Sequence, residues 1–143
     1  MLGQAAGVVG VLAASCLLGG MVFFGVVMAP LVFTKLDAAS SGPFIRATFP
    51  RYYLYVLVAA GLGAVGLVAL DPVSAAILAL VAAVTAWLLW GLMPRINALR
   101  DAELAGDAAA GSRFAQLHRA SVSVNMIQLV AVLFALIRVA LDL

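Results

Sequence analysis

The clearest chemical pattern in this chain is a set of polar side chains within an apolar run near the C-terminal end. His118, Ser121, Asn125 and Gln128 are separated by 3, 4 and 3 residues. At about 100° per residue, this spacing predicts that all four lie on one face of a helix. Hydroxyl and amide groups bind partners by hydrogen bonds, and an imidazole can also titrate near neutral pH or bind a metal.

We call these four residues the polar stripe. Hydrocarbon cannot satisfy polar side chains, so the stripe must face other helices or a water-filled cavity. One interpretation is a set of interhelical hydrogen bonds that fixes the packing, worth about 0.6 kcal/mol per bond on average. The other is a functional cavity for a solute, an ion or a proton, with Thr85 at the same depth as Gln128. The sequence leaves both interpretations open.

A separate hypothesis concerns metal binding. His118, Met28 and Met126 are ligand types that suit Cu(I), although no CxxC motif accompanies them and methionine is a common core residue. The chain has one cysteine and one histidine, which excludes an internal disulfide framework, a cysteine-rich metal site and a bis-histidine haem within one chain. The sequence therefore requires no cofactor and leaves the identity of any cofactor unknown.

The elements that position these residues follow from the composition. Of the 143 residues, 66% are hydrophobic and 10% are charged, and the mean hydropathy is +1.21. A soluble domain is about half apolar and about a quarter charged, whereas a membrane span needs about 20 apolar residues. We therefore expect an all-α integral membrane four-helix bundle that forms a single domain over residues 1–143. Its predicted spans are about 5–33, 52–70, 73–93 and 120–141.

Basic residues predict the orientation of the bundle. Seven of the eight lie in the two loops that precede the second and fourth spans: Lys35, Arg46, Arg51, Arg95, Arg100, Arg113 and Arg119. By the positive-inside rule, both loops are expected to be cytoplasmic and both termini outside, in the inner (plasma) membrane. Arg138, near the opposite surface, is expected to snorkel to the outer headgroups.

The chain also carries signals for turns and helix ends. Asp71 and Pro72 predict an N-cap and a first helical residue, hence a tight hairpin between the second and third spans. Pro94 is expected to end or kink the third helix. The third and fourth helices are expected to extend into a cytoplasmic hairpin, with Ser112 as a possible N-cap.

Two further local features concern the first half of the chain. Pro43 and Pro50 bracket residues 44–49, which are expected to form a short amphipathic piece at the surface. Small residues in the first two spans predict tight packing between helices or, alternatively, a dimer interface. They include Gly7, Gly10, Gly19, Gly20, Gly25, Ala59, Gly63 and Gly66.

Four segments occur in an order that resembles a known family. They are FFGVVMAPLVF, TFPRYY, LMPRINALRD and FAQLHRASVSVN, beginning at Phe23, Thr48, Leu92 and Phe114. The chain resembles the transmembrane protein 205-like family of small membrane proteins, including its bacterial branch of unknown function. The resemblance implies four membrane helices and no established enzymatic activity.

The same resemblance implies which polar residues matter. It places recurring polar positions at Pro94, Arg95, His118, Ser121 and Asn125, and the basic motif after the third span also contains Asn97 and Arg100. Proposed roles in the family concern export or tolerance of metals and drugs. The N-terminal pattern is distantly similar to copper-resistance inner-membrane proteins, but this chain lacks their additional histidines.

Three classes of function were weighed against these residues. A binding or transport role for a small solute or metal, through a polar cavity between helices, is the main prediction. A non-catalytic accessory or structural subunit of a larger membrane complex is the alternative. An enzyme is not expected, because the apolar runs contain no carboxylate for acid–base chemistry. The expected partners are the lipid bilayer and either further copies of this chain or other subunits, with no nucleic acid.

Overall fold

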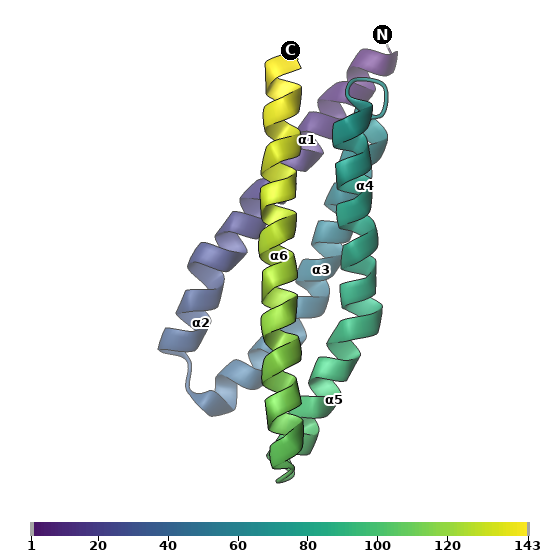
Figure 1. The fold of residues 1–143 in the computed structure, drawn as a ribbon. Coiled ribbons are helices and arrows are strands. Elements are labelled where there is room, and N and C mark those ends of the chain that lie inside the picture. The colour runs from purple at the N-terminus through teal and green to yellow at the C-terminus, as the bar shows by residue number, and fades with distance from the viewer. Residues whose placement is uncertain (1, 143) are drawn as a thin grey trace.

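The computed structural model describes residues 2–142, which form a bundle of long helices joined by short turns (Figure 1). Two of the long helices contain a π-helical stretch, marked η. In chain order the elements are α1 (Leu2–Phe23), η1 (Phe24–Met28), α2 (Ala29–Lys35), α3 (Ala38–Leu67), α4 (Pro72–Trp87), η2 (Leu88–Leu92), α5 (Met93–Leu104) and α6 (Ala108–Asp142).

Four helical segments of the described chain are long and apolar enough to cross a membrane. They are Gly3–Lys35, Ala39–Leu67, Pro72–Leu104 and Ala108–Leu141. Large apolar side chains such as Val65 and Ile127 are exposed on the outside of the bundle, as is expected where lipid replaces water. The prediction of an all-helical membrane protein with four spans is therefore confirmed for the described residues.

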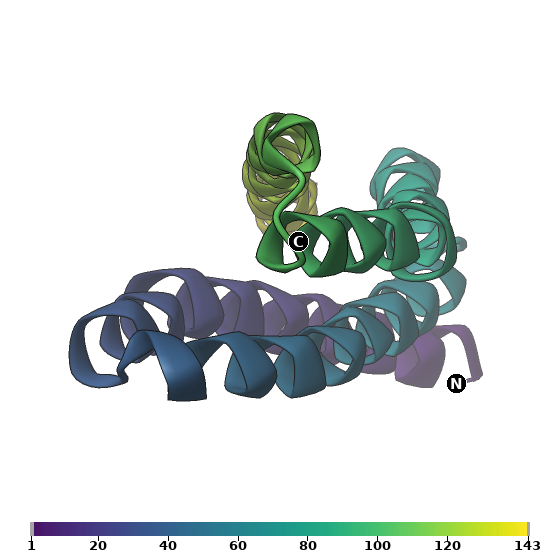
Figure 2. The same ribbon diagram turned by 90° about the horizontal axis from the view of Figure 1, so that it is seen from below.

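The bundle consists of two helical hairpins packed as layers. One layer contains α1, α2 and α3, and the other contains α4, α5 and α6 (Figure 2). The two termini lie at the same end as the α3–α4 turn, and the turns at residues 36–37 and 105–107 lie at the opposite end (Figure 1). We call this opposite end the basic end, because most of the basic residues flank its two turns.

Glycines bring α1 and α3 into backbone contact. Gly10 and Gly66 are both buried, and a Cβ atom built on Gly66 would lie 2.5 Å from the Cα of Gly10. Gly63 packs against Leu78 of α4 and Ala14 of α1. Tight packing within the bundle is thus confirmed for these glycines. Small residues allow this approach because they place no side chain between the two backbones.

Each of the two segments with a π-helical stretch carries a proline just after it. Pro30 and Pro94 each occupy the first turn of the helix that follows, α2 and α5. A proline ring lacks an N–H group and clashes with the carbonyl four residues earlier, and a local widening of the helix relieves this clash. Pro94 therefore distorts the third span but does not end it.

The region before the second predicted span differs from the sequence prediction. Residues 44–49 are not a separate surface piece, because α3 begins at Ala38 and contains both Pro43 and Pro50. Its first part runs at an angle to the rest of the helix (Figure 1). Prolines inside a helix bend it, and they are tolerated in membrane helices when other groups satisfy the freed backbone.

The two hairpin turns were predicted with different success. Asp71 caps α4 by accepting a hydrogen bond from the Val73 N–H, and Pro72 is the first residue of that helix, as expected. Ser112 does not cap α6. Asp107 does so, accepting hydrogen bonds from two backbone N–H groups at the start of the helix. The turn closes early because Gly106 adopts a φ of 102°, which only glycine adopts easily.

Candidate functional site

Asn125 is buried in α6 and connects this helix to α3. Its Nδ2 atom donates to the Tyr53 hydroxyl over 3.2 Å and to the Ser121 carbonyl over 2.9 Å. Tyr53 is not among the site residues that the sequence predicts, yet it is only 3% exposed. Helical phase is the signal that was missed, since Tyr53 shares one face of α3 with the buried Val56 and Ala60.

Gln128 lies one turn further along and connects α6 to α4. Its Nε2 atom donates to the Thr85 hydroxyl and to the Val81 carbonyl, each over 3.0 Å. Gln128 is 4% exposed and Thr85 is fully buried. The structure therefore brings together the two residues that depth along the helices had matched. Together, Tyr53, Thr85, Asn125 and Gln128 form what we call the polar site.

Both amide side chains of the polar site keep an oxygen without a hydrogen bond. Asn125 Oδ1 and Gln128 Oε1 are buried and have no partner among the described residues. A buried acceptor that loses its water costs about 1–3 kcal/mol, and such groups are uncommon in native proteins. The polar site therefore presents two free acceptors about one helical turn apart on α6.

The other two residues of the polar stripe have different surroundings. Ser121 is buried, and its hydroxyl donates to the His118 carbonyl over 2.8 Å. The His118 imidazole is half-buried and stacks on Phe114, with 5.8 Å between the ring centroids. The stripe is thus divided into a buried amide part and an aromatic contact nearer the basic end.

The residues proposed as metal ligands do not form a common site. His118 and Met126 are eight residues apart on α6, which is about 12 Å along a helix and too far for both to bind one ion. Met126 is 47% exposed on the outside of the bundle, and Met28 lies half-buried in η1. Over residues 2–142, no group of three or more His, Cys, Asp or Glu could hold a metal ion. The geometry gives the metal hypothesis no support.

A polar cluster that the sequence analysis did not predict lies at the end opposite the basic end. Arg138 Nε and Nη2 donate to the two carboxylate oxygens of Asp71 over 3.2 and 3.3 Å. The Ser74 hydroxyl lies 2.6 Å from Asp71 Oδ2. The expectation that Arg138 snorkels to lipid headgroups is corrected, because a carboxylate that is only 5% exposed pairs with it.

The positions of these two residues in the sequence already place them at the same end of the bundle. Asp71 is the acidic residue of the α3–α4 turn, and Arg138 is the basic residue of the last apolar run. Hydrogen bonds from Ser74 and then Arg138 lower the pKa of Asp71 to about 2. The cluster therefore holds a charged pair that ties the start of α4 to the end of α6.

The motif predicted at the basic end lies within α5. Pro94 and Arg95 are exposed, and Asn97 is half-buried. Arg100 pairs with Glu103, and its guanidinium lies 5.4 Å from the centre of the Phe114 ring. The ion pair lies within α5, and the contact with Phe114 attaches α5 to α6 at the basic end.

An ion pair connects the two layers at the same end. Arg46 of α3 donates two hydrogen bonds to the Asp101 carboxylate of α5, over 2.7 and 3.2 Å. Both side chains are substantially exposed, so the pair contributes modestly in spite of its bidentate geometry.

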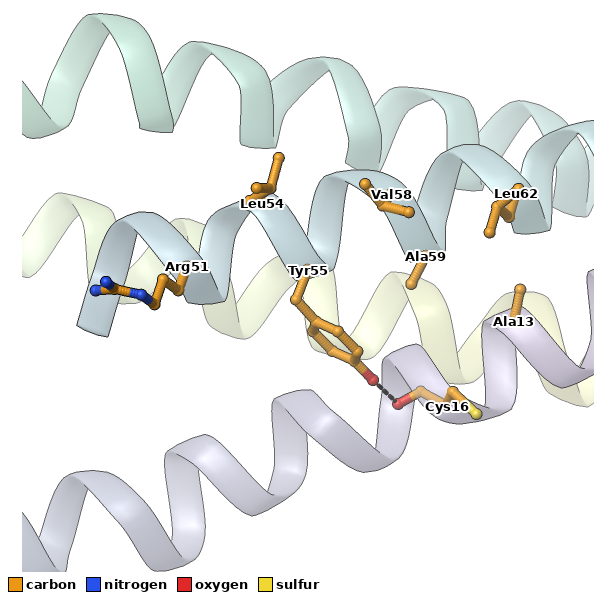
Figure 3. Close-up of a pocket in the computed structure, with 8 residues that line it drawn as sticks. All are labelled: Ala13, Cys16, Arg51, Leu54, Tyr55, Val58, Ala59 and Leu62. Atoms are coloured by element: carbon orange, nitrogen blue, oxygen red, sulfur yellow. Dashed lines mark hydrogen bonds between the residues drawn. The ribbon is translucent and has the colours of Figure 1, made fainter. Parts of the chain in front are cut away.

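A shallow apolar groove of about 470 Å³ runs between α1 and α3 on the outside of the bundle (Figure 3). The Tyr55 hydroxyl crosses it and donates to the Cys16 carbonyl. Most of its walls are aliphatic, from residues such as Leu54, Val58 and Leu62. Neither unpartnered oxygen lies in this groove, so it is separate from the polar site.

These features define a class of protein: a four-span membrane bundle with a buried, uncharged polar site. The chain belongs to the family described as a domain of unknown function, DUF4149, whose sequence model matches residues 12–105. The match includes Tyr53 and Thr85 and ends before α6, which supplies Asn125 and Gln128. No curated protein and no solved structure matches this chain.

Proposed function

We propose that this protein binds a small hydrogen-bond donor in the polar site between α3, α4 and α6. The observation that supports the proposal is the pair of buried, unpartnered oxygens, Asn125 Oδ1 and Gln128 Oε1. A donor bound beside either oxygen would satisfy it and recover the desolvation penalty that the oxygen otherwise carries.

The chemistry of the polar site limits the ligand. Its four side chains are uncharged, and the two free groups are acceptors. Such a site suits a neutral donor, such as an alcohol or an amide, or a monovalent cation such as ammonium. It offers no fixed negative charge for a divalent ion and no free cation for an anion. The proposed role is binding without catalysis, and passage across the membrane would need further copies of the chain.

One observation favours a second candidate, an accessory or structural subunit. The amide nitrogens of Asn125 and Gln128 already make hydrogen bonds to α3 and α4. If the protein is such a subunit, the polar site fixes helix packing and binds no ligand. The function of the protein then lies in its contacts with other subunits.

A native mass spectrum of the protein, released gently from its own membrane, tests the first candidate. We expect a discrete small adduct on the wild-type chain that disappears in Asn125→Leu and Gln128→Leu, because both changes remove an acceptor. Asn125→Leu should change the free energy of unfolding by less than about 1 kcal/mol, since the loss of two hydrogen bonds is offset by the loss of an unpaired buried acceptor.

The matched control is Ser123→Leu, which removes a polar group from the exposed face of the same helix. This variant should keep the adduct. A bare wild-type chain, combined with a marked loss of thermal stability in Asn125→Leu, would contradict ligand binding and support the structural role.

We also propose that the basic end faces the cytoplasm and that the protein lies in the inner (plasma) membrane. Most of the basic residues lie at that end, which is the distribution that the positive-inside rule associates with the cytoplasmic surface. In this orientation both termini are outside, and the α5–α6 turn forms a short hairpin beyond the cytoplasmic surface.

Labelling of single cysteines tests this orientation. In a Cys16→Ser background, Ala69→Cys reports on the α3–α4 turn and Ala109→Cys on the α5–α6 turn, and both alanines are exposed. A membrane-impermeant maleimide should label Ala69→Cys in intact cells and Ala109→Cys only after the membrane is opened. The reverse pattern would contradict the proposed orientation.

The closer kinship with transmembrane protein 205-like proteins is also a proposal. It is supported by the order of the four segments that begin at Phe23, Thr48, Leu92 and Phe114. A role in tolerance of metals or drugs rests on that resemblance alone, and the polar site favours neutral or monovalent donors over soft metals.

A further inference from the structure

The acidic side chains at the basic end are already engaged. Asp101 pairs with Arg46 and Glu103 pairs with Arg100. The remaining carboxylates accept hydrogen bonds from backbone N–H groups where α3 and α6 begin; they belong to Asp37 and Asp107. The carboxylates at this end therefore leave other guanidinium groups without a neutralising partner.

Two such guanidinium groups line one groove. Arg95 of α5 and Arg113 of α6 are exposed, and within residues 2–142 neither makes an ion pair or a hydrogen bond. They line a groove of about 550 Å³, together with Ala98, Leu99, Gln116 and Leu117. A guanidinium presents a planar set of donors that matches the oxygens of a phosphate.

The position of the groove along the helices indicates what kind of anion reaches it. Trp87 and Trp90 are exposed on the outside of the third span, 55% and 66% respectively, and exposed tryptophans favour the interface between hydrocarbon and headgroups. Arg95 follows Trp90 by five residues, or about 7.5 Å along a helix. The groove is therefore expected at the level of the lipid phosphates.

We infer that the groove between α5 and α6 binds the headgroup of an anionic phospholipid, with Arg95 and Arg113 holding its phosphate from the two helices. The apolar wall formed by Leu99 and Leu117 would contact the glycerol and the first acyl carbons. Basic pockets between membrane helices are known to bind anionic headgroups in this way. Because the lipid touches both helices, it would hold the α5–α6 hairpin together. This inference does not depend on a ligand in the polar site.

Lipid binding by the purified full-length protein tests the inference. The protein in an uncharged detergent is titrated with phosphatidylglycerol or phosphatidylcholine, and the bound lipid is counted by native mass spectrometry. We expect phosphatidylglycerol to bind more tightly than phosphatidylcholine. Arg95→Gln and Arg113→Gln should each weaken phosphatidylglycerol binding about fivefold, and higher salt should weaken it further.

The matched control is Arg119→Gln, which removes the same charge from an exposed position on α6 outside the groove. It should retain wild-type affinity, and far-UV circular dichroism should show unchanged helicity in all three variants. An equal loss in Arg119→Gln would overturn the inference in favour of a general effect of net charge. Equal binding of the two lipids, or displacement of phosphatidylglycerol by an equal concentration of inorganic phosphate, would also overturn it.

Discussion

Replacing Gly66 by alanine is expected to destabilise the bundle more than any other methyl-sized change in α3. The new Cβ atom would lie 2.5 Å from the Cα and N atoms of Gly10 and 2.7 Å from the Ala6 carbonyl oxygen. These neighbours are backbone atoms, so no side-chain rotation can relieve the clash and α1 must move away from α3. We expect Gly66→Ala to lower the free energy of unfolding by about 1–3 kcal/mol, the usual range for overpacking.

Gly61→Ala is the matched control, because it adds the same atom to the same helix. A Cβ atom at Gly61 would meet nothing within 4 Å, so this change should be neutral or stabilise the protein by up to about 1 kcal/mol through a less flexible unfolded chain. Unfolding in mixed detergent micelles, followed by helical circular dichroism, measures both. If the two variants unfold at the same point, the backbone contact between α1 and α3 does not exist in solution.

Gly10→Ala provides a second check on the same contact. Its Cβ atom would lie 2.7 Å from the Gly66 carbonyl carbon, so it pushes the same two backbones apart. Once one alanine has moved the two helices apart, the Cβ atom of the second alanine overlaps less with the opposing backbone. The double variant Gly10→Ala/Gly66→Ala should therefore cost less than the sum of the single variants, which is the signature of residues in direct contact.

The sequence predicted the spans and the buried face of α6 because both depend on local patterns. Apolar runs of membrane length are read directly from composition. The period of an α-helix places Ser121, Asn125 and Gln128 on one face. Thr85 matches Gln128 when residues are counted along each helix from the same boundary of the membrane. This count works because both helices cross the same hydrocarbon layer.

Tyr53 could not be matched to Asn125 by the same count. Depth fixes the level of a residue along its helix but not the direction in which its side chain points. That direction depends on how the helices of the bundle pack together, and this packing depends on contacts such as Gly10–Gly66 between residues far apart in sequence. The same limit concealed the Asp71–Arg138 pair, whose members are 67 residues apart.

The errors at helix boundaries have a different physical origin. Pro43 and Pro50 bracket residues 44–49, and in a soluble helix an interior proline costs about 3 kcal/mol, so the pattern favours a separate short piece. In a membrane, a helix is the way for a single segment to satisfy its own backbone, so the helix continues through both prolines. Ser112 was a plausible cap by type, but Gly106 lets the chain turn earlier and gives that role to Asp107.

Loss of stability in acid is expected to depend on Asp71. Its pKa is lowered to about 2 by hydrogen bonds from Ser74 and Arg138, whereas an unperturbed aspartate has a pKa of about 3.9. A group whose pKa is depressed by folding contributes stability that is complete above its unfolded pKa. That contribution disappears as the pH falls through the folded pKa. The wild-type melting temperature should therefore drop between about pH 4 and pH 2.

Asp71→Asn should lower the melting temperature at neutral pH and flatten its dependence on pH in this window. The asparagine can still cap α4, so what the change removes is the negative charge that faces the partly buried guanidinium of Arg138. Asp107→Asn is the control, since Asp107 also caps a helix but, within residues 2–142, has no arginine among its hydrogen-bond partners. That variant should keep the wild-type drop in melting temperature in acid.

Arg138→Gln should flatten the dependence of melting temperature on pH as Asp71→Asn does. The double variant should be no less stable than either single variant, because the two side chains act as one unit. A wild-type drop that persists in Asp71→Asn would assign the acid sensitivity to other carboxylates and leave the pair at the α3–α4 turn without a measurable role.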